Sequence, residues 1–290
     1  MPELPEVETS RREVERAARG KIIRAVTTVE DAIVYDGVSS AQIRAALVGR
    51  TVTGSARWGK HFWLELDQRP WPVFHFGMTG WMHVYREEVE RPKFMKLELE
   101  MEDGTRIAFR DPRRLGRLRL RMDPRNEAPI SALGFDPVHN LPAASVFIDE
   151  LARRKSPIKA VLLDQSFSAG VGNWIADEVL YQSGLDPRRH ASALTPKEVR
   201  RLRLKLKSVV QKAVEVGSDD TQFPRTWLFH YRWGKTKGAV DGHGNPILFG
   251  TVGGRTTAWV GARKNKKRRG SVGSPSFYST WTGIRRIERS

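Results

Sequence analysis

The first eight residues of the chain, Met-Pro-Glu-Leu-Pro-Glu-Val-Glu, hold groups that could perform nucleophilic chemistry. If Met1 is removed, which the small second residue should permit, Pro2 becomes a free secondary amine. The pKa of an α-amino group is roughly 8, so about a tenth of it is neutral and reactive at pH 7. Attack by a secondary amine on an electrophilic carbon gives an iminium cation, which acts as an electron sink. Glu3 stands beside this amine and could move protons.

A purely structural interpretation of the same stretch stays open from these residues alone. Pro5 suits the first position of a helix, and Glu6 and Glu8 suit the positively polarised start of that helix. Lys60 lies in the run Arg-Trp-Gly-Lys-His-Phe-Trp at the start of a predicted strand. By itself it is an ordinary exposed lysine.

The composition indicates a polyanionic partner. The 290 residues leave room for two domains with a core each, and the net charge is +17. Such a charge favours nucleic acid or an anionic membrane surface. No apolar run approaches the length of about 18 residues that suggests a membrane span, and no signal-peptide pattern is present. The absence of cysteine excludes disulfides and cysteine-ligated zinc or iron–sulfur sites.

The elements that must position these groups fall into two halves with different periodicity. In the first half we expect helices at residues 5–18 and 39–48. Strand character, partly with period-two alternation, is found at residues 21–29, 51–57, 61–67, 72–76, 94–101, 105–109 and 116–121. Many short strands with one or two helices predict a β-sandwich or barrel.

The second half follows a stretch rich in Pro, Asn, Asp and Gly and is mainly helical. Helices are predicted at residues 146–154, 158–165 and 174–183, and from a capping box at Thr195 to about residue 216. Residues 229–260 have strand character again. A basic, polar tail begins at residues 263–269, and we expect it to be disordered.

Three glycine-containing runs stand out in this framework. Residues 170–172, Gly-Val-Gly, lead to Asn173 as the expected N-cap of a helix, where backbone N–H groups can approach a phosphate. The other two runs are His-Phe-Gly-Met-Thr-Gly at residues 75–80 and Asp-Pro-Arg-Arg-Leu-Gly at residues 111–116. Taken alone, Met78 and Leu115 would be core residues.

Together, the N-terminal motif and these runs resemble the formamidopyrimidine-DNA glycosylases, the family shared with endonuclease VIII-like enzymes. The resemblance covers about residues 1–262. It implies that Pro2 is the nucleophile, that Glu3 is a catalytic acid and that Glu6 helps to orient the N-terminus. It also implies that Lys60 contacts the substrate and assists catalysis.

The resemblance further implies a set of DNA-binding residues. Those entering the duplex would be Met78, Arg113 and Leu115, with Arg114 beside them; the remaining contacts would come from Lys159, Asn173 and Arg255. Leu115 departs from the phenylalanine usual in the family, which keeps an apolar wedge but weakens stacking on the bases. Taken alone, Lys159 would be a solvated helix lysine.

The family usually ends in a four-cysteine zinc finger, which this chain cannot build. His230 and His243 are two separated histidines and cannot close a zinc site. The run Gly-Gly-Arg-Thr-Thr-Ala-Trp at residues 253–259 resembles the hairpin tip of the zincless finger of the plant and fungal branch, in which Arg255 would contact phosphates. We therefore expect no metal and no cofactor.

The expected fold is α+β: an N-terminal two-layered β-sandwich with flanking helices and a C-terminal helix-two-turn-helix domain with a zincless β-hairpin finger. The expected segments are the sandwich at residues 1–122, a linker at 123–144, the helical region at 145–228, the hairpin at 229–262 and the tail at 263–290.

The resemblance implies a bifunctional DNA glycosylase of base excision repair that also nicks abasic sites by β- and δ-elimination. We expect a monomer that acts on double-stranded DNA with oxidised bases or abasic sites, without a membrane partner. It would lie in the nucleus of a eukaryote, or otherwise in the cytoplasm with the nucleoid. Residues 217–230 look shorter than in bacterial members, where a longer loop covers 8-oxoguanine, so we expect weak removal of that base.

Two alternatives remain. A non-catalytic damaged-DNA-binding protein could keep the fold, but Pro2, Glu3 and Lys60 are all present, which argues against it. An RNA-binding or ribosome-associated basic protein is favoured by the charge alone.

Overall fold

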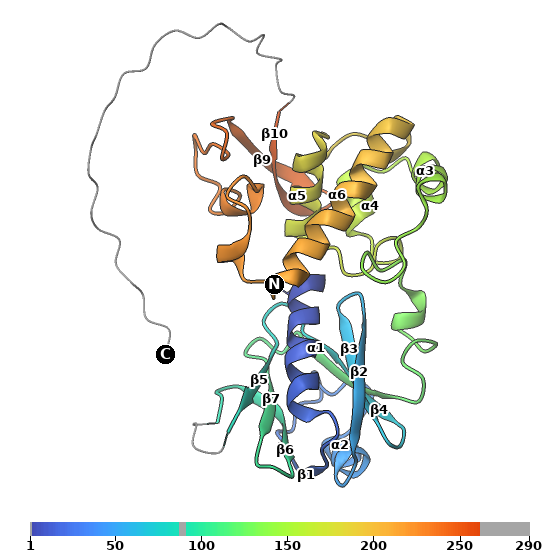
Figure 1. Cartoon of the computed structure of the whole chain (residues 1–290), viewed down its shortest axis with the longest axis vertical. Coiled ribbons are helices and arrows are strands. Elements are labelled where there is room, and N and C mark those ends of the chain that lie inside the picture. The colour runs from blue at the N-terminus through green and yellow to red at the C-terminus, as the bar shows by residue number, and fades with distance from the viewer. Residues whose placement is uncertain (1, 87–90, 262–290) are drawn as a thin grey trace, which may run out of the picture.

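The computed structural model describes residues 2–86 and 91–261 as two domains, one at each end of a long molecule (Figure 1). The N-terminal domain holds helices α1 (Leu4–Ala18) and α2 (Ser40–Leu47). Its strands are β1 (Ile23–Thr28), β2 (Val52–Trp58), β3 (His61–Leu66), β4 (Trp71–His75), β5 (Trp81–Tyr85), β6 (Met95–Met101), β7 (Arg106–Arg110) and β8 (Arg117–Arg121). They form two antiparallel sheets with the orders β1-β6-β7-β5 and β2-β3-β4-β8, so the predicted sandwich is confirmed.

Alternating burial explains the sandwich. In β6 the side chains of Leu97, Leu99 and Met101 are buried at every second position, and they face the core between the sheets. At its centre lie stacked and edge-on rings of Phe62, Phe74, Phe76 and Phe109. Strand β5 has no counterpart in the sequence prediction. It lies at a sheet edge and fully buries Met82 alone among its five residues, so it shows no clear alternation.

Helix α1 belongs to both domains. It starts one residue before the predicted Pro5, with a capping box in which Glu3 and Glu6 exchange hydrogen bonds with each other's backbone. Val7 and Val14 pack into the sandwich core, whereas Leu4 packs into the core of the C-terminal domain. The helix therefore runs from one core into the other, as its central position in Figure 1 shows.

The C-terminal domain is helical with one hairpin. It contains α3 (Ala144–Ala152), α4 (Ile158–Leu163), α5 (Asn173–Ser183), α6 (Pro196–Glu215) and the paired strands β9 (Ile247–Val252) and β10 (Arg255–Val260). The capping box at Thr195 is confirmed, and α6 buries its apolar stripe against α3 and α5. Helix α5 begins one residue earlier than predicted: Gly172 is its N-cap, and Asn173 is its first residue.

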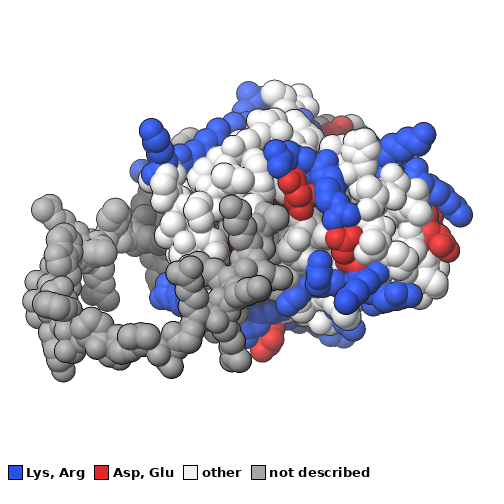
Figure 2. Space-filling view, turned by 90° about the horizontal axis from the view of Figure 1, so that it is seen from above, with Lys and Arg blue, Asp and Glu red and all other residues white. Residues whose placement is uncertain are grey.

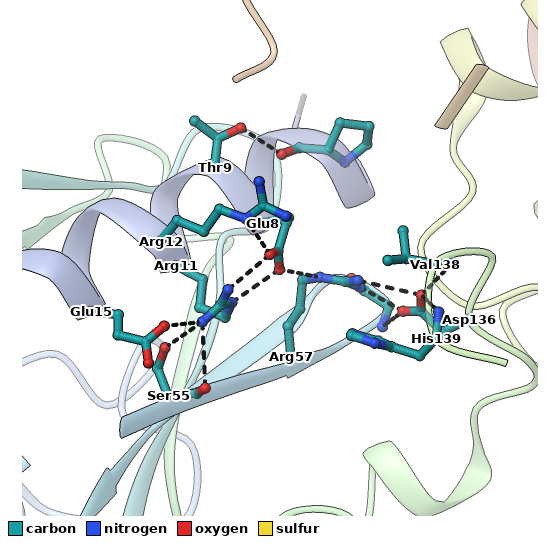
Figure 3. Close-up of polar contacts among 12 residues, drawn as sticks. Glu8, Thr9, Arg11, Arg12, Glu15, Ser55, Arg57, Asp136, Val138 and His139 are labelled. Carbon is teal, nitrogen blue, oxygen red and sulfur yellow. Dashed lines mark hydrogen bonds and ion pairs between the residues drawn. The ribbon is translucent and has the colours of Figure 1, made fainter. Parts of the chain in front are cut away.

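The stretch predicted as a linker is packed tightly at one point (Figure 3). Asp136 is fully buried and accepts hydrogen bonds from the Arg57 guanidinium at 2.5 Å and from the Gly59 backbone N–H at 2.8 Å. The other side of Arg57 contacts Glu8 of α1 at 3.1 Å. This chain of buried charges joins α1, β2 and the linker, and it fixes the turn that carries Lys60.

The basic charge is spread over the surface. Seen from the C-terminal domain, Lys and Arg side chains cover the molecule in several groups, with some acidic side chains between them (Figure 2). Within residues 2–86 and 91–261, no helix is long and apolar enough to cross a membrane. The predicted basic tail lies outside the described residues.

Candidate active site

Pro2 lies where two cavities meet between the domains. The first, which we call the cationic cavity, has a volume of about 310 Å³, and its wall includes Pro2, Lys60, His75 and Arg255. The second, the aromatic cavity, has a volume of about 350 Å³ and is lined by Pro2, Glu6, Met78, Thr79, Gly80, Trp81, Trp174, Phe229 and Trp233. A reactive nitrogen at Pro2 would thus have a charged space on one side and an aromatic space on the other.

Glu3 is buried against the start of α5. Its carboxylate accepts the backbone N–H groups of Trp174 at 2.9 Å and Ile175 at 3.2 Å, so it caps a helix from the other domain. A Cβ at Gly172 would lie 2.2 Å from the Glu3 carboxyl carbon, so this position requires glycine. Burial raises the pKa of Glu3 to about 7, against the opposing effect of the Lys60 charge. The carboxyl can therefore both give and take a proton near neutral pH.

Glu6 ties the start of the chain to α5. Its two carboxylate oxygens accept the backbone N–H of Glu3 at 2.9 Å and the indole N–H of Trp174 at 3.1 Å. Burial raises its pKa as well. These bonds fix the orientation of Pro2 relative to the start of α1.

Lys60 lies opposite Glu3 in the cationic cavity. Its ammonium donates to the Val171 carbonyl at 3.3 Å, in the loop that precedes α5. Burial lowers the pKa of Lys60, the Glu3 charge raises it, and Arg255 lowers it again. The structure thus brings Pro2, Glu3, Lys60 and Arg255 together from three separate segments.

The two loops at residues 75–80 and 111–116 pack back to back beside this site. A Cβ on Gly77 would lie 2.4 Å from the Leu115 carbonyl, so only glycine allows the loops to approach this closely. Met78 is 40% exposed and Leu115 38%, so the interpretation of both as core residues is wrong. The buried Asp111 accepts hydrogen bonds from Thr79, Arg113 and Gly116 and so joins the two loops.

The comparisons with known proteins agree with this geometry. Residues 1–118 match the family model of the formamidopyrimidine-DNA glycosylase N-terminal domain, and residues 133–225 match that of the H2TH domain. The chain belongs to the formamidopyrimidine-DNA glycosylase family. It is 41% identical over 274 residues to the formamidopyrimidine-DNA glycosylase of Arabidopsis thaliana, an alignment that covers 90% of this chain and 70% of that protein. The Bacillus subtilis enzyme of the same name is 30% identical over 278 residues, covering 92% and 100%.

Solved structures of the family have the same fold. The Lactococcus lactis formamidopyrimidine-DNA glycosylase in complex with DNA that contains Fapy-dG superposes with a TM-score of 0.78 at 26% identity, covering 89% of this chain and 98% of that one. The same enzyme with abasic-site DNA gives a TM-score of 0.76 at 25% identity, covering 89% and 97%.

Lys159 is placed differently from the expectation for a DNA-binding residue of a formamidopyrimidine-DNA glycosylase. It is 0% exposed, so the interpretation as a solvated helix lysine is wrong, and its contact with DNA stays a prediction. Its ammonium pairs with Asp177 of α5 at 2.6 Å and donates to the Thr257 hydroxyl at 2.7 Å. Burying a lysine requires such partners, and here they attach the hairpin to the helices.

The hairpin of this family member is held through Asp177. Besides Lys159, its carboxylate accepts hydrogen bonds from Arg232 at 2.7 Å and from the Ala258 backbone N–H at 3.1 Å. Arg255 is exposed at the start of β10 and lines the cationic cavity. In the part of the chain that the structure describes, no group of three or more His, Asp or Glu residues could hold a metal ion.

The other expected DNA-binding residues line neither cavity. Asn173 is the first residue of α5, and its side-chain Oδ1 is buried without a hydrogen-bond partner among the described residues. Arg113 is exposed, and Arg114 pairs with Asp31 at 2.9 Å. Their contacts with DNA stay predictions.

Several residues of the site were not identified from the sequence. His75 lies in the cationic cavity, where its Nδ1 accepts the Gly77 backbone N–H at 3.2 Å; burial and nearby cations lower its pKa to about 4, so it is neutral at neutral pH. Its place in the run at residues 75–80 could have indicated it. Phe229 and Trp233 of the aromatic cavity lie in residues 229–246, where the prediction of strands is wrong because β9 begins only at Ile247, and no motif marks them.

Proposed function

We propose that this protein is a DNA glycosylase of base excision repair that also cleaves abasic sites, with the Pro2 amine as nucleophile. The observation that carries the proposal is the meeting of Pro2 and Lys60 in one cavity, with the buried Glu3 next to Pro2 in the chain, under the influence of the Lys60 charge and with a pKa of about 7. The substrate we propose is double-stranded DNA with an oxidised or ring-opened base or an abasic site. Solved relatives in complex with Fapy-dG DNA and abasic-site DNA support this choice.

In the first step the neutral Pro2 nitrogen attacks C1′ of the damaged nucleotide. The bond between C1′ and the base breaks, and its electron pair leaves with the base, which takes up the proton that the Pro2 nitrogen loses. Protonated Glu3 then gives its proton to the sugar ring oxygen, the C1′–O4′ bond opens, and an iminium cation joins C1′ to Pro2. A carboxyl buried to a pKa of about 7 holds that proton at neutral pH, whereas an exposed glutamate does not.

The iminium then withdraws electrons from the sugar. Loss of a proton from C2′ sends its electron pair towards the iminium, and the C3′–O bond breaks to release the 3′ phosphate; a second elimination across C4′ and C5′ releases the 5′ phosphate. Water finally releases the sugar remnant from Pro2. The positive charges of Lys60 and Arg255 in the cationic cavity stabilise the phosphate leaving groups.

The surrounding residues would bind and open the duplex. We propose that Met78, Arg113 and Leu115 fill the gap left by the everted nucleotide, because two of them expose apolar side chains beside Pro2. Asn173 at the start of α5 and Arg255 at the hairpin would contact backbone phosphates.

Borohydride trapping tests the proposal. Reduction should fix a covalent adduct between the protein and a duplex with one abasic site, and an N-terminal tag or a blocked amine on Pro2→Gly should abolish it. Undiminished trapping by the tagged protein would instead assign the nucleophile to a lysine such as Lys60. A non-catalytic DNA-binding protein would bind the duplex in a gel-shift assay and give no adduct.

A further inference from the structure

The two cavities beside Pro2 differ in chemistry, and this difference divides the nucleotide between them. The argument rests on the proposed function, in which C1′ is attacked by the Pro2 nitrogen. The phosphates and the base leave the sugar in different directions, so they must occupy different spaces. The cationic cavity, with Lys60 and Arg255, suits phosphate, whereas the aromatic cavity suits a flat base.

The wall of the aromatic cavity is a ladder of rings that ends in an exposed indole. Trp174 and Phe229 meet edge to face with centroids 5.2 Å apart, and Phe229 meets Trp233 in the same way at 5.4 Å. Trp174 is buried, whereas Trp233 is 53% exposed. A large apolar ring that stays uncovered next to the nucleophile is a candidate stacking surface for a ligand.

Contacts of Arg232 hold the Trp233 ring in place. The Arg232 guanidinium lies 4.6 Å from the centre of its ring, and Arg232 is in turn fixed by Asp177 of α5 at 2.7 Å. The next residue of α5, Glu178, accepts the backbone N–H of Phe229 at 2.8 Å. The helix that receives Glu3 at its first turn therefore also fixes this wall, so the wall and the nucleophile share one rigid support.

The Glu6 and Thr79 side chains of the cavity already take part in hydrogen bonds within the described structure. Both Glu6 oxygens accept hydrogen bonds, and the Thr79 hydroxyl donates to Asp111 at 2.9 Å. A base in this space would be recognised by its ring faces more than by its edges. We infer that Trp233 stacks on the everted base and selects planar damaged bases by shape, with little reading of their hydrogen-bond pattern.

The test separates base release from sugar cleavage. Single-turnover rates are measured on two matched duplexes, one with a formamidopyrimidine and one with a preformed abasic site at the same position. Because base–aromatic stacking contributes strongly to binding of an unstacked base, Trp233→Ala should slow base release about tenfold to a hundredfold. The abasic duplex has no base to stack, so its cleavage should change by less than about threefold on the same reasoning.

Two further variants separate stacking from bulk. Trp233→Phe should keep most of the base-release rate, whereas Trp233→Leu should lose as much as Trp233→Ala. On a duplex with a saturated, puckered base such as 5,6-dihydrothymine, Trp233→Ala should slow base release less than it does on the planar substrate. Leu204→Ala removes an equally exposed apolar side chain on α6, outside both cavities, and serves as the matched control.

An equal loss on both duplexes, or no loss of base release, would overturn the assignment of Trp233. Full activity of Trp233→Leu would overturn stacking as its cause. If the unsubstituted protein failed to cleave the abasic duplex, the proposed function itself would fail, and the two failures are therefore distinguishable.

Discussion

The buried pairing of Arg57 with Asp136 allows a sharp test of how the site is supported. Both side chains are 0% exposed, and the guanidinium lies between Asp136 at 2.5 Å and Glu8 at 3.1 Å (Figure 3). Asp136→Ala would leave Arg57 with one counter-charge in a place that water does not reach. Removing one partner of a buried ion pair costs roughly 3–5 kcal/mol, because the remaining charge is uncompensated.

Thermal denaturation measures this loss. At about 2–4 °C per kcal/mol for a chain of this size class, the melting temperature should fall by about 6–20 °C. Asp149→Ala, at an exposed position on α3, is the matched control and should leave the melting temperature nearly unchanged. A fall of less than about 2 °C for Asp136→Ala would contradict the reasoning.

A second substitution tests whether charge is the cause. Arg57→Met combined with Asp136→Ala removes the unpaired charge, so the double variant should be more stable than the sum of the single losses implies. If the stability losses of the two single variants simply added up in the double variant, lost packing and not the unpaired charge would be the main cause of the destabilisation. Asp136 also holds the Gly59 N–H beside Lys60, so cleavage of an abasic duplex well below the melting temperature should fall in Asp136→Ala.

Four further predictions concern the site directly. Burial raises the pKa of Glu3 from 4.5 to about 7, so the folded protein holds this proton more tightly than the unfolded chain and loses about 3 kcal/mol of stability as pH rises through that window. Glu3→Gln should therefore be more thermostable than the unsubstituted protein at pH 8 and no more so at pH 4.5; an equal difference at both would contradict the burial argument. Chelators should leave DNA cleavage unchanged, and Arg255→Ala should weaken binding to all sequences and lower the salt dependence by roughly one counterion; loss of cleavage after chelation would refute zinc independence. Single-turnover removal of 8-oxoguanine should be slower than that of a hydantoin, both opposite cytosine, and comparable rates would refute the short-loop hypothesis. Arg113→Ala should slow base excision from a duplex by about one to two orders of magnitude, or roughly 1.4–2.8 kcal/mol, but should slow cleavage of a single-stranded abasic oligonucleotide much less. An equal loss on both substrates would mean that Arg113 holds the backbone or the fold. Leu115→Phe should keep or improve duplex activity.

Local signals explain which elements could be predicted from the sequence. The capping box at Thr195 marks the start of α6, and alternation marks β6, because both patterns lie within a few neighbouring residues. Strand β5 lacks such a pattern, since an edge strand buries few side chains. Lys159 was misjudged for a different reason: its partners Asp177 and Thr257 lie far along the chain, and no local rule pairs them.

The residues of the candidate site also differ in whether a local sequence signal marks them. Pro2, Glu3 and Lys60 lie in motifs that resemble the family, so their meeting could be predicted. Asp136 lies in a stretch whose prolines and polar residues indicate a loose connection, and its burial follows from a charge on β2. Trp233 occupies a position that neither periodicity nor a motif marks.

The double membership of α1 also bears on how the protein is made. Leu4 donates its backbone N–H to the Gly170 carbonyl at 3.1 Å, and Glu3 binds the N–H of Trp174, 171 residues further along the chain. The start of the chain leaves the ribosome first, yet its binding site is completed only after more than half of the protein has been synthesised. Until then Glu3 is not buried, so its pKa is not raised, and α5 is not yet present to fix the orientation of Pro2. On the proposed function, a nascent chain would carry the nucleophile without the means to use it, and reactivity towards DNA would begin only when the second domain has folded onto the first helix.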